Sequence, residues 1–132
     1  MVTTDRAALL AAIEAVEKAK CGDGMLDRQI QMAIEGWRNL GGGFREWIVD
    51  GRREPYNYII PSPHYTTGLD AALTLVIKDW EYEISTLYGI ARVRLPLNAS
   101  VEPSEGERKD GNVPLAACLA ALRARLAELE KA

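Results

Sequence analysis

Apolar residues recur at helical spacing near both ends of the chain. This periodicity predicts a helix over about residues 4–20 and a second one over about 25–40, which ends at three consecutive glycines. The apolar face of the first helix contains Leu9, Ile13 and Val16. Because only a short Gly-Asp-Gly turn at 22–24 separates them, the two helices should form an αα-hairpin.

A further long helix is expected at the C-terminal end, with Asn112 as its cap. Over residues 115–129 the apolar positions form a continuous stripe, and most charged residues lie on the other side. The stripe consists of Leu115, Cys118, Leu119, Leu122, Leu126 and Leu129.

Alternation of apolar and polar residues over 80–95 predicts a β-hairpin with a two-residue turn at Tyr88-Gly89. The paired positions are then Ile84 with Val93, Tyr82 with Leu95, and Glu83 with Arg94. One face is apolar and should pack against helices, whereas opposite charges meet on the other, solvated face. A shift by two residues preserves both faces, so the sequence predicts the faces and leaves the register open.

The middle of the chain gives weaker signals. Residues 44–60 are β-prone around Asp50-Gly51, and they predict either a hairpin or an ordered loop with one strand. Pro55 requires the second strand to begin after it or to lie at an edge. Thr67-Gly68-Leu69-Asp70 has the form of a capping box and should start a helix of about three turns. Residues 96–112 are polar and rich in Pro, Gly and Ser, which predicts a flexible loop, either a solvated tether or a binding loop.

These elements give the order α-α-β(β)-α-β-β-α within a single domain, residues 1–132. Consecutive hairpins indicate antiparallel pairing, and amphipathic helices need a surface to cover. We therefore expect an α+β fold in which a mainly antiparallel β-sheet is layered with α-helices, similar to an α/β/α sandwich. The apolar share of 48% is typical of globular domains and excludes wholesale disorder.

The net charge, the lengths of the apolar runs and the spacing of the cysteines limit the classes of partner and ligand that we expect. Nineteen acidic residues against 16 basic ones give a formal charge of −3, the opposite of the balance with which proteins neutralise phosphates, so we expect no direct nucleic-acid binding. The apolar runs are too short to span a bilayer, and the first residues lack a signal-peptide pattern, so we expect no direct membrane association. Cys21 and Cys118 match no metal-ligand spacing; we expect reduced thiols, no metal and no cofactor.

Candidate binding residues gather in the β-prone segment, where arginines neighbour aromatic rings: Arg45, Trp47, Arg52, Arg53, Tyr56 and Tyr58. This combination is typical of protein-binding hot spots and of sites that stack a base and hold a phosphate. A half-buried hairpin with its charges in solvent would contain the same residues. His64 and Tyr65, in the following Pro-rich turn, complete the candidate surface.

Signs of catalysis are sparse. The chain has one histidine, so a catalytic triad or a zinc site would lack partner residues. The best arrangement for an enzyme pairs His64 with Asp70 near Tyr65, but the capping box also explains Asp70. Cys118 is expected in the core because its neighbours on the helix face are leucines.

The segment 63–76, PHYTTGLDAALTLV, resembles the P-x-Y-T-x-S-x-D-A-A-x-x-L-V segment of the phage ABA sandwich domain, a family of small phage and prophage proteins. Trp80 and the alternating strands after it are similar to the tryptophan-led β segment of that family, and residues 114–122 to its alanine-rich terminal helix. Gly68 stands where the family commonly has serine. The resemblance covers about residues 25–128 and implies a phage origin and helix layers around a β-sheet, but no activity.

We therefore expect a non-catalytic phage or prophage accessory protein that acts by binding in the host cytoplasm, such as a counter-defence inhibitor of a host immune complex. It would either mimic nucleic acid on a host protein complex through its acidic surface, or form an oligomer whose interface traps a small nucleotide signal. A virion or scaffold component is the alternative, and a small hydrolase-type enzyme is less favoured. The leucine stripe of the last helix and an open sheet edge favour a homo-oligomer.

Overall fold

The computed structural model describes residues 6–35, 47–49, 52–54, 63–77, 80–96 and 103–131. The helices in these ranges are α1 (Arg6–Lys18), α2 (Gly24–Glu35), α3 (Leu69–Leu73) and α4 (Val113–Lys131). The strands are β1 (Trp47–Val49), β2 (Arg52–Glu54), β3 (Glu83–Leu87), β4 (Ile90–Leu95) and β5 (Ser104–Arg108). This is an α+β fold, as the sequence predicts.

The larger sheet has three antiparallel strands in the order β3-β4-β5. Its first hairpin has, of the registers that the sequence left open, the one with Ile84 opposite Val93 and Glu83 opposite Arg94. The turn at Tyr88-Gly89 is confirmed, and both residues have positive φ, 54° and 77°, as in the type I′ turns that favour two-residue hairpins. Tyr82 lies outside the strand and is 43% exposed, so its predicted pairing with Leu95 on the apolar face is wrong.

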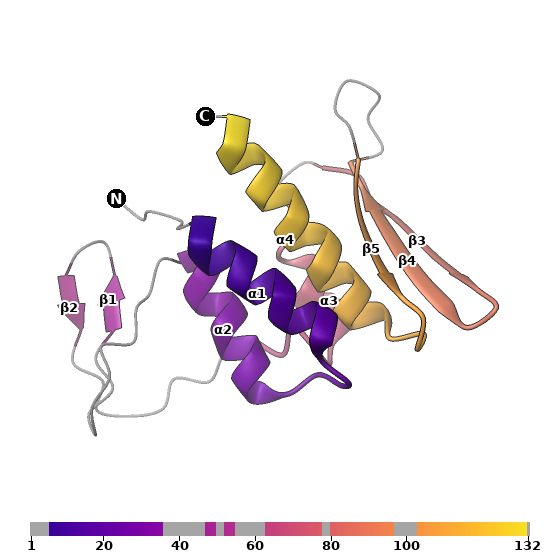
Figure 1. Ribbon diagram of the computed structural model, residues 1–132, viewed down its shortest axis with the longest axis horizontal. Coiled ribbons are helices and arrows are strands. Elements are labelled where there is room, and N and C mark those ends of the chain that lie inside the picture. The colour runs from indigo at the N-terminus through magenta and orange to yellow at the C-terminus, as the bar shows by residue number, and fades with distance from the viewer. Residues whose placement is uncertain are drawn as a thin grey trace.

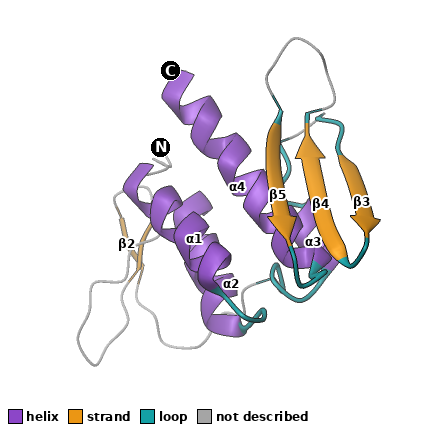
Figure 2. Ribbon diagram, turned by 45° about the vertical axis from the view of Figure 1, so that its right-hand side comes forward, coloured by secondary structure: helices purple, strands orange, loops and turns teal. Residues whose placement is uncertain are grey.

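The long helix α4 lies across one face of this sheet, and α1 and α3 pack against α4 (Figure 1). Helix α2 packs against α1 on the side away from the sheet (Figure 2). The opposite face carries charged cross-strand pairs, with Arg92 3.0 Å from Glu107 and Arg94 2.9 Å from Glu105. In the described ranges the helices therefore cover one face of the sheet, and the other is the solvated face that the sequence predicts.

The contact between β5 and α4 depends on small residues. Five alanines of α4 are fully buried: Ala116, Ala117, Ala120, Ala121 and Ala124. Two of them face Gly106 of β5, where a Cβ atom would be 2.1 Å from the carbonyl oxygen of Ala116 and 2.6 Å from the amide nitrogen of Ala120. The strand and the helix thus approach more closely than larger side chains would permit.

Strand β5 corrects the prediction of a flexible loop over residues 96–112 for its C-terminal part, whereas residues 97–102 lie outside the described ranges. Its inward positions are Ser104, Gly106 and Arg108, none of which is an apolar residue with high strand propensity. Charged Glu105 and Glu107 face outward. The strand forms because its backbone pairs with β4 and because Gly106 allows close packing against α4. Neither cause produces an alternation of apolar and polar residues in the sequence.

Two local predictions also differ from the structure. The hairpin around Asp50-Gly51 is present, and its second strand, β2, precedes Pro55; of the two alternatives for this strand, a start after Pro55 is wrong, whereas a position at a sheet edge is found. The three-residue strands end before the proline, which would remove a donor from the ladder. The predicted capping box is wrong, because Gly68 is the N-cap of α3 and makes no side-chain cap, and α3 has five residues rather than three turns.

Candidate functional site

The predicted aromatic–arginine segment is described only in part. Arg45, Tyr56 and Tyr58 lie outside the described residues. Trp47 lies on β1, opposite β2 with Arg52 and Arg53. The binding role of this segment stays a prediction.

The two candidate residues of the Pro-rich turn, His64 and Tyr65, differ in their exposure to solvent. The side chain of His64 is 81% exposed, whereas Tyr65 is 4% exposed and belongs to the hydrophobic core. The Tyr65 carbonyl accepts a hydrogen bond from the buried Cys118 thiol at 3.1 Å. The structure therefore places Tyr65 inside the protein and not on the predicted binding surface.

A buried carboxylate anchors this turn to α2. Asp27 is 2% exposed, and its Oδ1 accepts hydrogen bonds from the backbone N–H of Thr66 at 2.8 Å and from the Thr66 hydroxyl at 2.6 Å. The close approach requires Gly22, where a Cβ would lie 2.2 Å from the Thr66 carbonyl oxygen. Sequence reasoning missed Asp27; its position between Leu26 and Ile30 on the apolar face of α2 was the available signal.

Asp27, not Asp70, is the carboxylate near the histidine. His64 Nδ1 lies 3.9 Å from Asp27 Oδ2, beyond hydrogen-bond distance, and Asp70 is exposed in the first turn of α3. The predicted pair of His64 with Asp70 is thus replaced by a loose contact with Asp27, whose carboxylate already binds Thr66. Its evident role is to fix the turn against α2.

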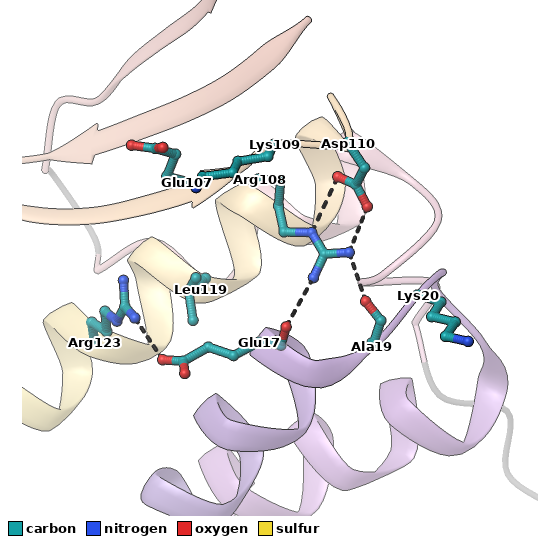
Figure 3. Close-up of a pocket in the computed structure, with 9 residues that line it drawn as sticks. All are labelled: Glu17, Ala19, Lys20, Glu107, Arg108, Lys109, Asp110, Leu119 and Arg123. Carbon is teal, nitrogen blue, oxygen red and sulfur yellow. Dashed lines mark hydrogen bonds and ion pairs between the residues drawn. The ribbon is translucent and has the colours of Figure 1, made fainter.

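A second feature is an open hollow of about 720 Å³ between the end of α1, the end of β5 and the middle of α4 (Figure 3). It is lined by Glu17, Ala19, Lys20, Glu107, Arg108, Lys109, Asp110, Leu119 and Arg123. This volume is within the range of small-molecule sites. Seven of the nine lining residues carry formal charges, so electrostatics decides what the hollow can bind.

Arg108 is the fixed centre of the hollow. Its guanidinium donates to the carbonyl oxygens of Val16 at 3.0 Å, Glu17 at 3.3 Å and Ala19 at 2.6 Å at the end of α1, where helix carbonyls run out of intrahelical donors. It also binds both carboxylate oxygens of Asp110. The hydrogen bond from Arg108, with a second one from the Asn112 backbone, lowers the pKa of Asp110 below its usual value. Arg108 is therefore a structural clamp with its donors occupied.

The other charges of the hollow divide into paired and unpaired groups. Arg123 forms an ion pair with Glu17 at 2.6 Å, and Glu107 is paired with Arg92. Within the described ranges, no carboxylate forms an ion pair with Lys20 or Lys109, and both are exposed. Figure 3 shows these two side chains on opposite sides of Arg108. The hollow therefore has an excess of positive charge, which suits an anionic ligand large enough to reach both ammonium groups.

The two cysteines should differ in reactivity. Burial raises the pKa of the Cys118 thiol to about 12, and the nearby Asp27 carboxylate adds to the shift, whereas Cys21 is exposed. We expect one thiol to react with a disulfide reagent at pH 8 in the native protein and a second only after unfolding, because the thiolate fraction of Cys118 is about 10⁻⁴. Cys21→Ser should abolish the native reaction, and rapid labelling of that variant would contradict the burial.

The same shift has a consequence for stability. The pKa of the Cys118 thiol is 9.0 in the unfolded chain and about 12 in the folded one. Between these two pH values the unfolded chain has lost a proton that the folded protein keeps. The contribution of the buried, protonated thiol to the free energy of unfolding is therefore complete below pH 9 and is lost as the pH rises toward 12.

Neither a metal cluster, a membrane helix nor a known relative identifies a function for the described residues. In the parts of the chain that the structure describes, no three His, Cys, Asp or Glu residues are grouped so as to hold a metal ion. No helix of the described ranges combines the length and apolar content needed to cross a membrane. Compared with family models, with curated proteins and with solved structures, the chain has no match.

Proposed function

We propose that this chain is a non-catalytic phage or prophage accessory protein that acts by binding, and that its ligand is an anionic nucleotide bound in the hollow beside Arg108. The observation that carries this proposal is the pair of ammonium groups, Lys20 and Lys109, which line the hollow without a carboxylate partner among the described residues. Phosphate groups would supply the missing negative charge.

The alternative, mimicry of nucleic acid by an acidic surface, has less support in the described part of the chain. Two carboxylates of the solvated sheet face, Glu105 and Glu107, are paired with Arg94 and Arg92. On the helices, Glu14 and Glu17 are paired with Lys18 and Arg123. A phosphate mimic needs carboxylates whose charge is not neutralised by neighbouring cations, as these are.

We expect Lys20→Ala and Lys109→Ala each to weaken nucleotide binding about tenfold, because each removes one charged contact to a phosphate of about 1.5 kcal/mol. The measurement is isothermal titration calorimetry of the purified protein with ATP, a cyclic dinucleotide and inorganic phosphate. Mass spectrometry of the supernatant after denaturation would detect a nucleotide that co-purifies.

Lys18→Ala is the matched control, since it removes the same charge near the end of α1 from a side chain that is paired with Glu14. It should leave binding unchanged apart from a small general electrostatic effect. Absence of heat with every probe, together with a host protein that is captured from infected cells and released by salt, would reject the nucleotide proposal in favour of mimicry.

A further inference from the structure

The outer edge of β3 is unpaired among the described residues. The sheet order makes β3 an edge strand, and Figure 2 shows no described strand or helix beyond it. Edge strands expose backbone N–H and C=O groups that can pair with another strand unless something blocks them. The free groups of β3 are therefore a surface for strand addition.

The register identifies these groups. Leu87 and Ile90 flank the two-residue turn, so they exchange both backbone hydrogen bonds, and such pairs alternate along an antiparallel ladder. Glu83 and Ser85 consequently point their backbone groups toward β4. Ile84 and Thr86 point theirs outward, which gives two donors and two acceptors on the free edge.

The sequence of β3 does not protect this edge. The strand, Glu-Ile-Ser-Thr-Leu, contains no proline and no lysine, and Glu83 is its one charged residue. Of the five large apolar residues exposed in the described ranges, three lie in this strand or directly beside it: Tyr82 (43%), Leu87 (66%) and Tyr88 (94%). An apolar, unprotected edge of this kind is typical of an interface.

We propose that β3 pairs antiparallel with β3 of a second copy of this chain, so that two three-stranded sheets become one of six strands. The two outward-facing residues then pair with each other, Ile84 with Thr86 of the second copy and the reverse. Ser85 lies on the two-fold axis, opposite its own counterpart. This arrangement places β-branched side chains across from each other, which is favourable on a pleated surface.

Charge and shape favour a second copy over an unrelated strand. A two-fold axis at Ser85 places the two Glu83 carboxylates at opposite ends of the contact, so the one charge of the strand meets no like charge across it. The same symmetry brings the Tyr82 end of each strand next to the Leu87–Tyr88 end of the other. All three exposed apolar residues are covered by one self-complementary contact, as a two-fold interface requires.

The test uses a cysteine on the axis. Directly opposite residues of the kind formed by Ser85 have Cα atoms about 4.5 Å apart, within the range that a disulfide needs. In a Cys21→Ser background, Ser85→Cys should form disulfide-linked dimers under mild oxidation. Glu83→Cys should not, since Glu83 is also exposed but lies opposite Leu87 of the second copy, four residues from the second Glu83. Equal cross-linking of the two variants would overturn the register.

A second test does not depend on covalent chemistry. Light scattering on a gel-filtration peak should give about twice the 14.6 kDa of the chain for the unmodified protein. Ser85→Lys and Ser85→Glu should each give monomers, because like charges would meet on the axis, and an equimolar mixture of the two should restore dimers. A monomeric unmodified protein, or no recovery on mixing, would overturn the proposal. The hollow lies at the β5 edge of the sheet, opposite the β3 edge, so nucleotide binding is measured separately and its failure would not bear on the dimer.

Discussion

Replacing Gly106 by alanine should lower the free energy of unfolding by about 3 kcal/mol, the upper end of the usual cost of overpacking a core. The new Cβ would meet the Ala116 carbonyl oxygen at 2.1 Å and the Ala120 amide nitrogen at 2.6 Å. Both atoms belong to the backbone of α4, so no side chain can rotate away. Relief requires that the strand and the helix move apart, which opens the contact that joins the sheet to the helices.

The measurement is equilibrium unfolding in urea, followed by circular dichroism. Gly24→Ala is the control, because it adds the same methyl group where no atom lies within 4 Å, at the first residue of α2. Alanine has the higher helix propensity, so this variant should be as stable as the unmodified protein or slightly more stable. If the two variants unfolded at the same urea concentration, the close contact between β5 and α4 would be refuted.

Replacing Arg108 by methionine should cost about 3 kcal/mol, since it keeps most of the side-chain volume but removes the whole hydrogen-bonding group. The carbonyl oxygens of Glu17 and Ala19 would lose this donor. The Val16 carbonyl and the Asp110 carboxylate would each be left, among the described residues, with a single backbone N–H. Arg108→Lys should recover only a part of this loss, because an ammonium group cannot bind a carboxylate at two points and three carbonyls as well.

The matched control is Arg92→Met, at an exposed position of the adjacent strand with a single ion pair to Glu107. Exposed pairs of this kind contribute little, so this variant should change the free energy of unfolding by about 0.5 kcal/mol or less. The measurement is equilibrium unfolding of both variants in urea, which compares their free energies of unfolding. A comparable loss from the two substitutions would show that the clamp at the end of α1 adds nothing beyond an ordinary surface charge.

Part of the candidate site could be found from the sequence, and part could not. The histidine and the turn that contains it were identified, but their nearest acidic partner, Asp27, is 37 residues away in the chain. Arg108 looked like one charge among many in a polar segment, and only its position at the end of α1 gives it three carbonyls to bind. Lys20 and Lys109 are likewise 89 residues apart in the chain, and both line the hollow only because β5 lies beside that helix end.

Local sequence determined the helices α1, α2 and α4 through periodicity, and the cap at Asn112 and the turn of the first hairpin through residue type, because each depends on contacts between residues close in the chain. The N–H of Leu115 donates to the Asn112 side chain at 3.0 Å, as the prediction requires. Only the tertiary structure decided the third strand, the burial of Asp27 and Arg108, and the hollow. These features depend on pairing and desolvation between segments that are distant in the chain. The buried positions of β5 are Gly106 and Arg108, and the strand is stable because its backbone pairs with β4, Gly106 packs against α4, and Arg108 donates hydrogen bonds to the carbonyls at the end of α1.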